Sequence, residues 1–117
     1  MREWVRRRMR RRTSAGAHAE RLAEEWLTRH HGMRVVARNW RNPADRREEI
    51  DLVLRDGPQL VFVEVKARAA SALVPGYYAV GPAKRAVLRR AVKSYLMGLR
   101  DSARPIRFDV EIGRAHV

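Results

Sequence analysis

The sequence contains no cysteine, which excludes disulfide bonds, thiolate zinc sites and cysteine nucleophiles. Long apolar runs are also missing, because the longest uninterrupted one, Leu60 to Val63, is far shorter than the roughly 20 residues of a membrane-spanning helix. Arginines interrupt residues 1–12 throughout, so this segment lacks the apolar centre of a signal peptide. We therefore expect a soluble protein without a membrane partner, and a cysteine-free chain suits the reducing cytoplasm.

Acidic residues are scarce relative to basic ones. The 13 Asp and Glu face 26 Lys and Arg, which gives a net charge of +13. A polyanion, above all nucleic acid, is the natural partner of such a chain, although general solubility or an anionic membrane surface is the alternative. Residues 1–12 hold seven Arg and one Glu with little apolar surface, so we interpret residues 1–14 as a disordered basic arm.

Residues 15–110 are predicted to form one α/β domain, because the chain is too short for a second. In the first helix Ala19, Leu22, Ala23, Trp26 and Leu27 recur at helical spacing. The patterns predict, in order, a helix at residues 15–31, strands at 33–40, 50–54 and 60–66, a helix at 82–99 and a strand at 106–110. Asp56-Gly57-Pro58 is a turn signal, so the second and third strands are predicted to pair as an antiparallel hairpin.

The third predicted strand carries two charged groups on one face. Side chains alternate faces along a strand, so Glu64 and Lys66 share one side. Charges moved away from water are costly unless they are paired or bind a metal. A simple ion pair at the end of a strand is the alternative to a functional site.

Asp51 lies between Ile50 and Leu52 in the neighbouring strand, and the predicted hairpin would place its side chain beside Glu64. Glu49 shares the face of Asp51. Two close carboxylates repel each other, but they suit a hard divalent cation that prefers oxygen ligands. The alternative is a solvated strand face.

Two further candidates lie on the helices. Glu20 falls at the border of the first helix's apolar stripe, about 90° from its centre at 100° per residue, so it is expected to reach over the sheet. A solvated carboxylate near the helix N-terminus is the alternative. Lys84 lies towards the apolar side of the second helix, near its start, and is expected to point at the same cleft or at its substrate.

In these residues and their surroundings, the chain resembles the bacterial YraN family of predicted endonucleases. Segments that match in order and spacing are residues 16–23, 37–41, 49–53, 61–68 and 107–110, together with Lys84. The central Glu-x-Asp and Glu-x-Lys pair is the most specific part. By position, the residues that match the family's functional set are Glu20, Asp51, Glu64 and Lys66, and Glu49 matches its other motif carboxylate. Glu48 departs from the pattern, because the family usually has glycine there, and this bears on the local turn and the metal geometry.

The resemblance implies a restriction-endonuclease-like fold with a magnesium site on a mixed sheet, similar to archaeal Holliday junction resolvases. The hypothesis is hydrolysis of DNA phosphodiesters, with Mg²⁺ or Mn²⁺ held by Asp51, Glu64 and the carbonyl of Val65. In this hypothesis Glu20 binds the metal directly or through water, and Lys66 orients the attacking water or neutralises the transition state. The residues expected to contact phosphates are Arg68, Lys84 and Arg41. A homodimer is expected only by analogy with junction resolvases, which cut two strands.

Two other functions fit the same residues. The first is a non-catalytic module that binds nucleic acid with this face, and the second is a basic structural protein associated with ribosomes or RNA. Residues 111–117 resemble the translation of a common sequencing adapter, and we interpret them as a non-native tail.

Overall fold

The computed structural model describes residues 14–69, 81–99 and 104–115. Its elements are α2 (Ser14–His31), β1 (Arg34–Arg41), β2 (Glu49–Asp56), β3 (Gln59–Ala69), α3 (Pro82–Met97) and β4 (Ile106–Ala115). This order and the α/β class confirm the expectation from the sequence. The basic arm, apart from Ser14, and most of the loop between β3 and α3 lie outside the described residues.

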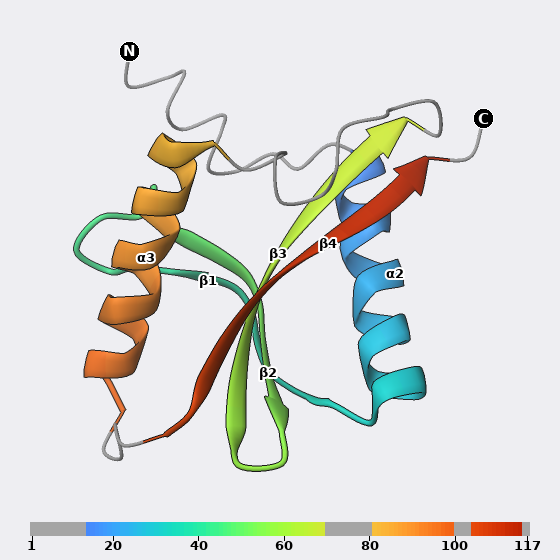
Figure 1. The fold of residues 1–117 in the computed structure, drawn as a ribbon. Coiled ribbons are helices and arrows are strands. Elements are labelled where there is room, and N and C mark those ends of the chain that lie inside the picture. The colour runs from blue at the N-terminus through green and yellow to red at the C-terminus, as the bar shows by residue number, and fades with distance from the viewer. Residues whose placement is uncertain (1–13, 70–80, 100–103, 116–117) are drawn as a thin grey trace.

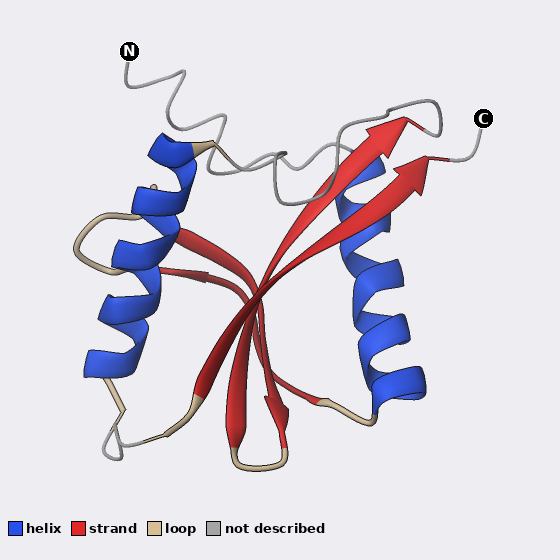
Figure 2. Ribbon diagram, viewed as in Figure 1, coloured by secondary structure: helices blue, strands red, loops and turns tan. Residues whose placement is uncertain are grey.

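The four strands form one mixed sheet in the order β1-β2-β3-β4 (Figure 2). β1 pairs with β2 and β2 with β3 in antiparallel directions, whereas β3 and β4 run parallel. The predicted hairpin is confirmed: Asp56 pairs with Gln59 across a turn in which Gly57 has a φ of 59°. That left-handed conformation favours glycine, which explains the turn signal in the sequence.

The two helices cover opposite faces of the sheet (Figure 1). Ala19 and Leu27 of α2 pack in one core cluster, and Ala91 and Val92 of α3 pack in the other. The predicted stripe of α2 was partly wrong, because Leu22 and Trp26 are exposed and the Trp26 ring packs against His30. α2 therefore touches the sheet along a narrower line than its sequence indicates. In the described part of the chain, no helix has the length and apolar character that a membrane crossing requires.

The sheet divides where β2 and β3 separate. The ladder between β2 and β3 ends at the pair Leu52–Val63. Beyond it β2 continues with β1 to the pair Arg41–Glu49, while β3 continues with β4 to the pair Ala69–Ala115. Figure 1 shows the two arms diverging from the hairpin. Residues next to the last shared pair therefore lie at a fork between the two arms of the sheet.

Candidate active site

Asp51 and Glu64 lie side by side at this fork. Val53 and Phe62 are direct partners in the ladder and belong to the core under α3, and Asp51 and Glu64 are each two residues further along the same face. Both carboxylates are buried, with exposed fractions of 9% and 5%. The backbone N–H of Val65 donates a 2.8 Å hydrogen bond to Oδ2 of Asp51. The Asp51 side chain thus binds the backbone of the neighbouring strand just where the ladder stops.

The proximity of the two acids changes the ionisation of Glu64. Burial, followed by the negative charge of Asp51, raises the pKa of Glu64 to about 7, and the ammonium groups of Lys84 and Lys66 act in the opposite direction. A hydrogen bond with Asp51 also favours the protonated form. In the metal-free protein near neutral pH, the carboxyl group of Glu64 is therefore protonated in part of the molecules and ionised in the rest.

Two ammonium groups face Glu64 from different elements. Nζ of Lys66 on β3 lies 3.6 Å from Oε1 of Glu64, and Nζ of Lys84, in the first turn of α3, lies 3.8 Å from the same oxygen. The side chains of the two lysines are 28% and 41% exposed, so the site reaches solvent through its cationic side. The structure therefore brings together Asp51, Glu64, Lys66 and Lys84.

Glu20 lies over the face of β2 that α2 covers. Its Oε2 accepts a 3.1 Å hydrogen bond from Nδ2 of Asn39, which has a φ of 50° at a left-handed position of β1. Glu20 also lines a hollow of about 410 Å³ together with Leu52, a residue of the core under α2. Within residues 14–69, 81–99 and 104–115, no three His, Asp or Glu side chains form a group that could hold a metal ion. The described geometry thus offers two carboxylates at one point, and the role of Glu20 remains a prediction.

The remaining candidates flank this group. Glu49 lies opposite Arg41 in the register of β1 and β2, with 3.6 Å between Oε2 and Nη2. Arg68 belongs to β3, but its side chain is outside the described residues. Val65 contributes its backbone at the end of the fork.

Glu48 is a buried carboxylate that the sequence did not identify as a structural residue. Its Oε1 accepts a 2.9 Å hydrogen bond from Nδ2 of Asn42, and its Oε2 accepts a 3.1 Å bond from Nε of Arg90 on α3. Its φ is not positive, since among the described residues other than glycine only Asn39 has that conformation. The turn therefore forms without glycine, and Glu48 ties α3, which carries Lys84, to the loop before β2.

Replacing Glu48 with alanine is expected to destabilise the protein by about 2 kcal/mol, because the buried amide of Asn42 loses its acceptor and Arg90 loses a charged partner. Urea unfolding of Glu48→Ala measures this loss. Arg90→Ala is the matched control and should cost less, since the Arg90 side chain is 59% exposed. Equal losses for both variants would contradict the importance of the Asn42 contact.

The chemistry of this group fits a divalent cation. Asp51 and Glu64 supply only oxygen donors, and their mutual repulsion in a buried place is relieved by a hard positive ion. The donor set does not suit zinc, which prefers nitrogen and sulfur ligands. Mg²⁺ or Mn²⁺ would suit such an all-oxygen donor pair.

Comparison with known proteins gives the family. Residues 19–112 match the model of the uncharacterised protein family UPF0102. The chain belongs to the UPF0102 family. This family is also called YraN, so the resemblance seen in the sequence is confirmed.

UPF0102 relatives span several bacterial groups. A UPF0102 protein of Beutenbergia cavernae is 45% identical over 102 residues, which cover 87% of this chain and 83% of the relative. One from Bordetella avium is 45% identical over 92 residues, which cover 76% of this chain and 61% of the relative. A third, from Chlorobium limicola, is 38% identical over 97 residues, or 83% of this chain and 72% of the relative. The names of these UPF0102 proteins describe no activity.

Proposed function

We propose that this protein is a metal-dependent endonuclease that hydrolyses phosphodiesters in DNA. The proposal depends on one observation: two buried carboxylates and two ammonium groups converge where β2 and β3 separate. Such a cluster is a costly way to stabilise an ordinary core, since each buried ion loses hydration. A site for a cation and a phosphate uses every one of these groups.

In this proposal the acidic residues bind the metal and the basic residues bind the phosphate. Asp51 and Glu64, with the carbonyl of Val65, would hold Mg²⁺ or Mn²⁺, which when bound stabilises charge on the phosphate and makes water a better nucleophile. Lys66, beside Glu64, neutralises the negative charge that develops on the phosphate. Lys84 approaches from α3 and fixes the phosphate from the other side. Glu20 would join the site from α2, directly or through a water molecule, although its described hydrogen bond is to Asn39 on the α2 side of the sheet.

The substrate class follows from the net charge of +13, which favours polyanions and makes affinity depend on salt. Arg41 and Arg68 would contact phosphates beside the site, and such contacts give little sequence selectivity. Branched or junction DNA is our preferred substrate, by analogy with the archaeal Holliday junction resolvases, to which the fold implied by the family resemblance is similar. A homodimer belongs to the same analogy, because two strands must then be cut.

The decisive experiment incubates the protein with branched, flapped and linear DNA in the presence of Mg²⁺ or Mn²⁺. We expect the wild type to cleave, and we expect Lys66→Ala and Lys84→Ala each to lower the rate by about 10² or more, since each removes a charge placed for the phosphate. Lys93→Ala is the matched control, because Lys93 lies on α3 but lines a different hollow. A wild type that cleaves none of these DNAs with either metal would refute the proposal, and cleavage by both test variants at the wild-type rate would refute the site.

A second candidate is a non-catalytic module that binds nucleic acid through the same face. One observation favours it: the described residues contain no group of three metal-binding side chains. Titration calorimetry separates the two functions. A binding module shows salt-sensitive DNA affinity and no Mg²⁺ site, whereas the nuclease shows a Mg²⁺ site that Asp51→Asn removes.

A further inference from the structure

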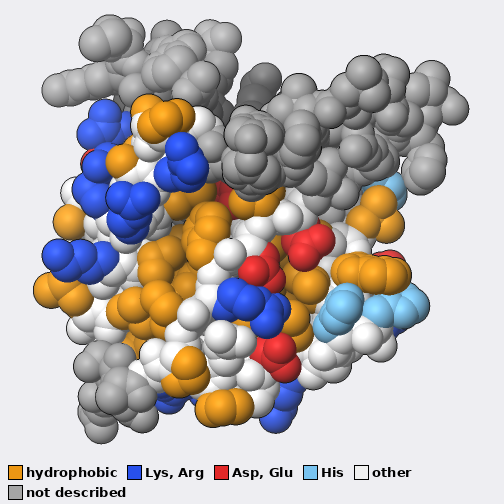
Figure 3. All heavy atoms as spheres, viewed as in Figure 1, with side chains coloured by type: hydrophobic (Ala, Val, Ile, Leu, Met, Phe, Trp, Pro, Cys, Tyr) orange, Lys and Arg blue, Asp and Glu red, His pale blue; other side chains and the backbone are white. Residues whose placement is uncertain are grey.

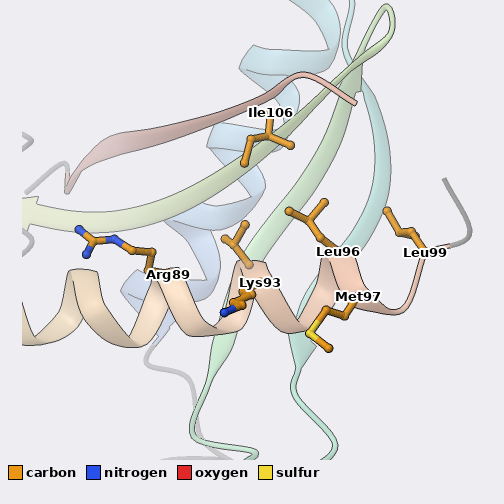
Figure 4. Close-up of a pocket in the computed structure, with 7 residues that line it drawn as sticks. Arg89, Lys93, Leu96, Met97, Leu99 and Ile106 are labelled. Carbon is orange, nitrogen blue, oxygen red and sulfur yellow. The ribbon is translucent and has the colours of Figure 1, made fainter. Parts of the chain in front are cut away.

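A second feature of the surface, remote from this chemistry, is a groove between α3 and β4. Its floor is formed by Leu88 and Val92 of α3 and by Ile106 and Phe108 of β4. It contains two hollows of about 510 and 280 Å³, which share Arg89, Val92 and Ile106 and therefore lie side by side. Figure 4 shows Leu96, Leu99 and Ile106 around the larger hollow. We call this feature the α3–β4 groove.

Large apolar side chains are exposed along the groove. Ile106 and Phe108 are 47% and 43% exposed, and Met97 at the end of the groove is 78% exposed. Figure 3 shows a continuous band of hydrophobic side chains on this face, next to the cationic side chains of α3. Contiguous apolar surface with a polar rim is typical of sites where proteins bind a partner.

The rim of the groove has one sign of charge. Arg85, Arg89 and Lys93 lie along the exposed side of α3 and line the two hollows. Among the residues that the structure describes, no Asp or Glu lines either hollow. A ligand for the groove must therefore combine apolar groups with negative charge.

The other wall of the groove is the edge of the sheet. β4 ends the strand order, and its described strand partner is β3 alone. An edge strand presents backbone N–H and C=O groups to a further strand, and an extended peptide can add there while alternate side chains enter a neighbouring groove.

From these observations we infer that the α3–β4 groove binds an extended acidic segment of a partner protein, which adds to β4 as a fifth strand. Its apolar side chains, at every second position, occupy the hollows over Val92, Ile106 and Phe108. Its carboxylates pair with Arg85, Arg89 and Lys93. The groove is thus a recruitment site, separate from the cluster around Glu64.

Two other occupants fit the groove less well. In a symmetric pair of copies the cations of each rim would approach those of the other, and like charges at an interface are unfavourable. Nucleic acid would satisfy the cations, but the floor is aliphatic except for Phe108, whereas bound bases need aromatic faces on which to stack. The apolar floor and the outer edge of β4, which among the described residues pairs with β3 alone, together favour a peptide.

The test uses the whole chain and a fluorescein-labelled peptide of about ten residues in which Asp or Glu alternates with Ile or Phe. We expect fluorescence anisotropy at physiological salt to give a Kd in the micromolar range. Arg85→Glu with Arg89→Glu should weaken binding at least about tenfold, because both rim charges reverse. Arg46→Glu with Arg47→Glu, on the exposed loop before β2, reverses the same number of charges and is the matched control, so it should bind like the wild type.

Three further probes decide the mode of binding. Ile106→Ser with Phe108→Ser should lose the peptide, and methylation of alternate peptide amides should prevent binding, since it blocks strand addition. The inference is overturned if a peptide with Lys in place of the acids binds equally well, or if the double charge reversal changes nothing. It is also overturned if sedimentation shows a dimer that Ile106→Ser with Phe108→Ser dissociates, or if the charge reversal weakens single-stranded DNA binding while the peptide never binds. Asp51→Asn should bind the peptide as the wild type does. Failure of the peptide proposal can therefore be distinguished from failure of the proposed nuclease activity.

Discussion

Asp51→Asn is expected to lower the rate of DNA cleavage by at least about 10³ and, at the same time, to make the metal-free protein more stable at neutral pH. The loss of activity follows because the substitution removes one of two carboxylates that we propose as metal ligands, and a bound cation is worth several kcal/mol of transition-state stabilisation. The gain in stability follows because Asp51 repels Glu64 in a buried place. Cleavage rates and urea unfolding in EDTA measure the two effects.

The asparagine side chain in Asp51→Asn retains the structural role of the aspartate, so the substitution tests the negative charge alone. Its amide oxygen can accept the hydrogen bond that the Val65 N–H donates to Asp51. Asp51→Ala is therefore the control: it removes the negative charge and also the acceptor, and an unpaired buried N–H costs about 1–3 kcal/mol. Both variants should be inactive, but only Asp51→Ala should lose the stability that this hydrogen bond provides. If Asp51→Asn is instead less stable than the wild type in EDTA, the repulsion that we attribute to this pair does not govern the site.

Asp51→Asn is expected to lower activity and to raise stability, and these opposite effects are why the cluster is informative about function. Residues selected only for folding would not place a second carboxylate beside Glu64, where each weakens the hydration of the other. A protein that keeps such a pair gives up stability for a property of the site. In the proposed function a bound cation would offset this cost, so metal should stabilise the wild type more than Asp51→Asn.

Much of this cluster could be predicted from the sequence because its geometry is local. The turn at Gly57 sets the register of β2 and β3, and the alternation of side chains then places Asp51 and Glu64 on one face. The helical phase of α3 likewise indicated that Lys84 points inward, and the structure places its Nζ 3.8 Å from Glu64. Such arguments need only the period of an element and the length of a turn.

Other features depend on contacts between residues that are distant in the chain. Glu48 meets Arg90 across 42 positions, so no periodicity could reveal that pair. β4 was predicted to end at residue 110, but its parallel pairing with β3 carries it to Ala115, and no short-range pattern marks that end. The sequence also did not determine which face α2 covers, and this decides where the carboxylate of Glu20 lies.

The exposure of Ile106 and Phe108 could not be predicted from the sequence either. The alternation of Ile106 and Phe108 with charged residues indicated a strand with an apolar face, which is usually buried. In the structure this face meets only part of α3, so both side chains are more than 40% exposed. The groove becomes visible only once the position of α3 over the sheet is known.

The second large effect concerns pH. The pKa of Glu64 is raised from its ordinary 4.5 to about 7, so the folded protein holds this proton more tightly than the unfolded chain does. The contribution of Glu64 to stability is therefore complete below pH 4.5 and is lost as the pH rises from 4.5 to about 7. Over that window the free energy of unfolding should fall by roughly 3 kcal/mol in EDTA.

Glu64→Gln isolates this contribution from the other titrating groups. Glutamine cannot ionise, so the variant should lack this loss, and its advantage over the wild type should grow from little at pH 4.5 to most of the expected difference at pH 8. Mg²⁺ should narrow the difference at pH 8, because a cation held by Asp51 and the ionised Glu64 would compensate the charge that the proton otherwise neutralises. Urea midpoints at several pH values, with EDTA and then with Mg²⁺, provide the measurement. An equal loss of stability in the variant and the wild type would mean that Glu64 ionises as freely as an exposed glutamate, and the physical argument for a cation at the fork would then fail.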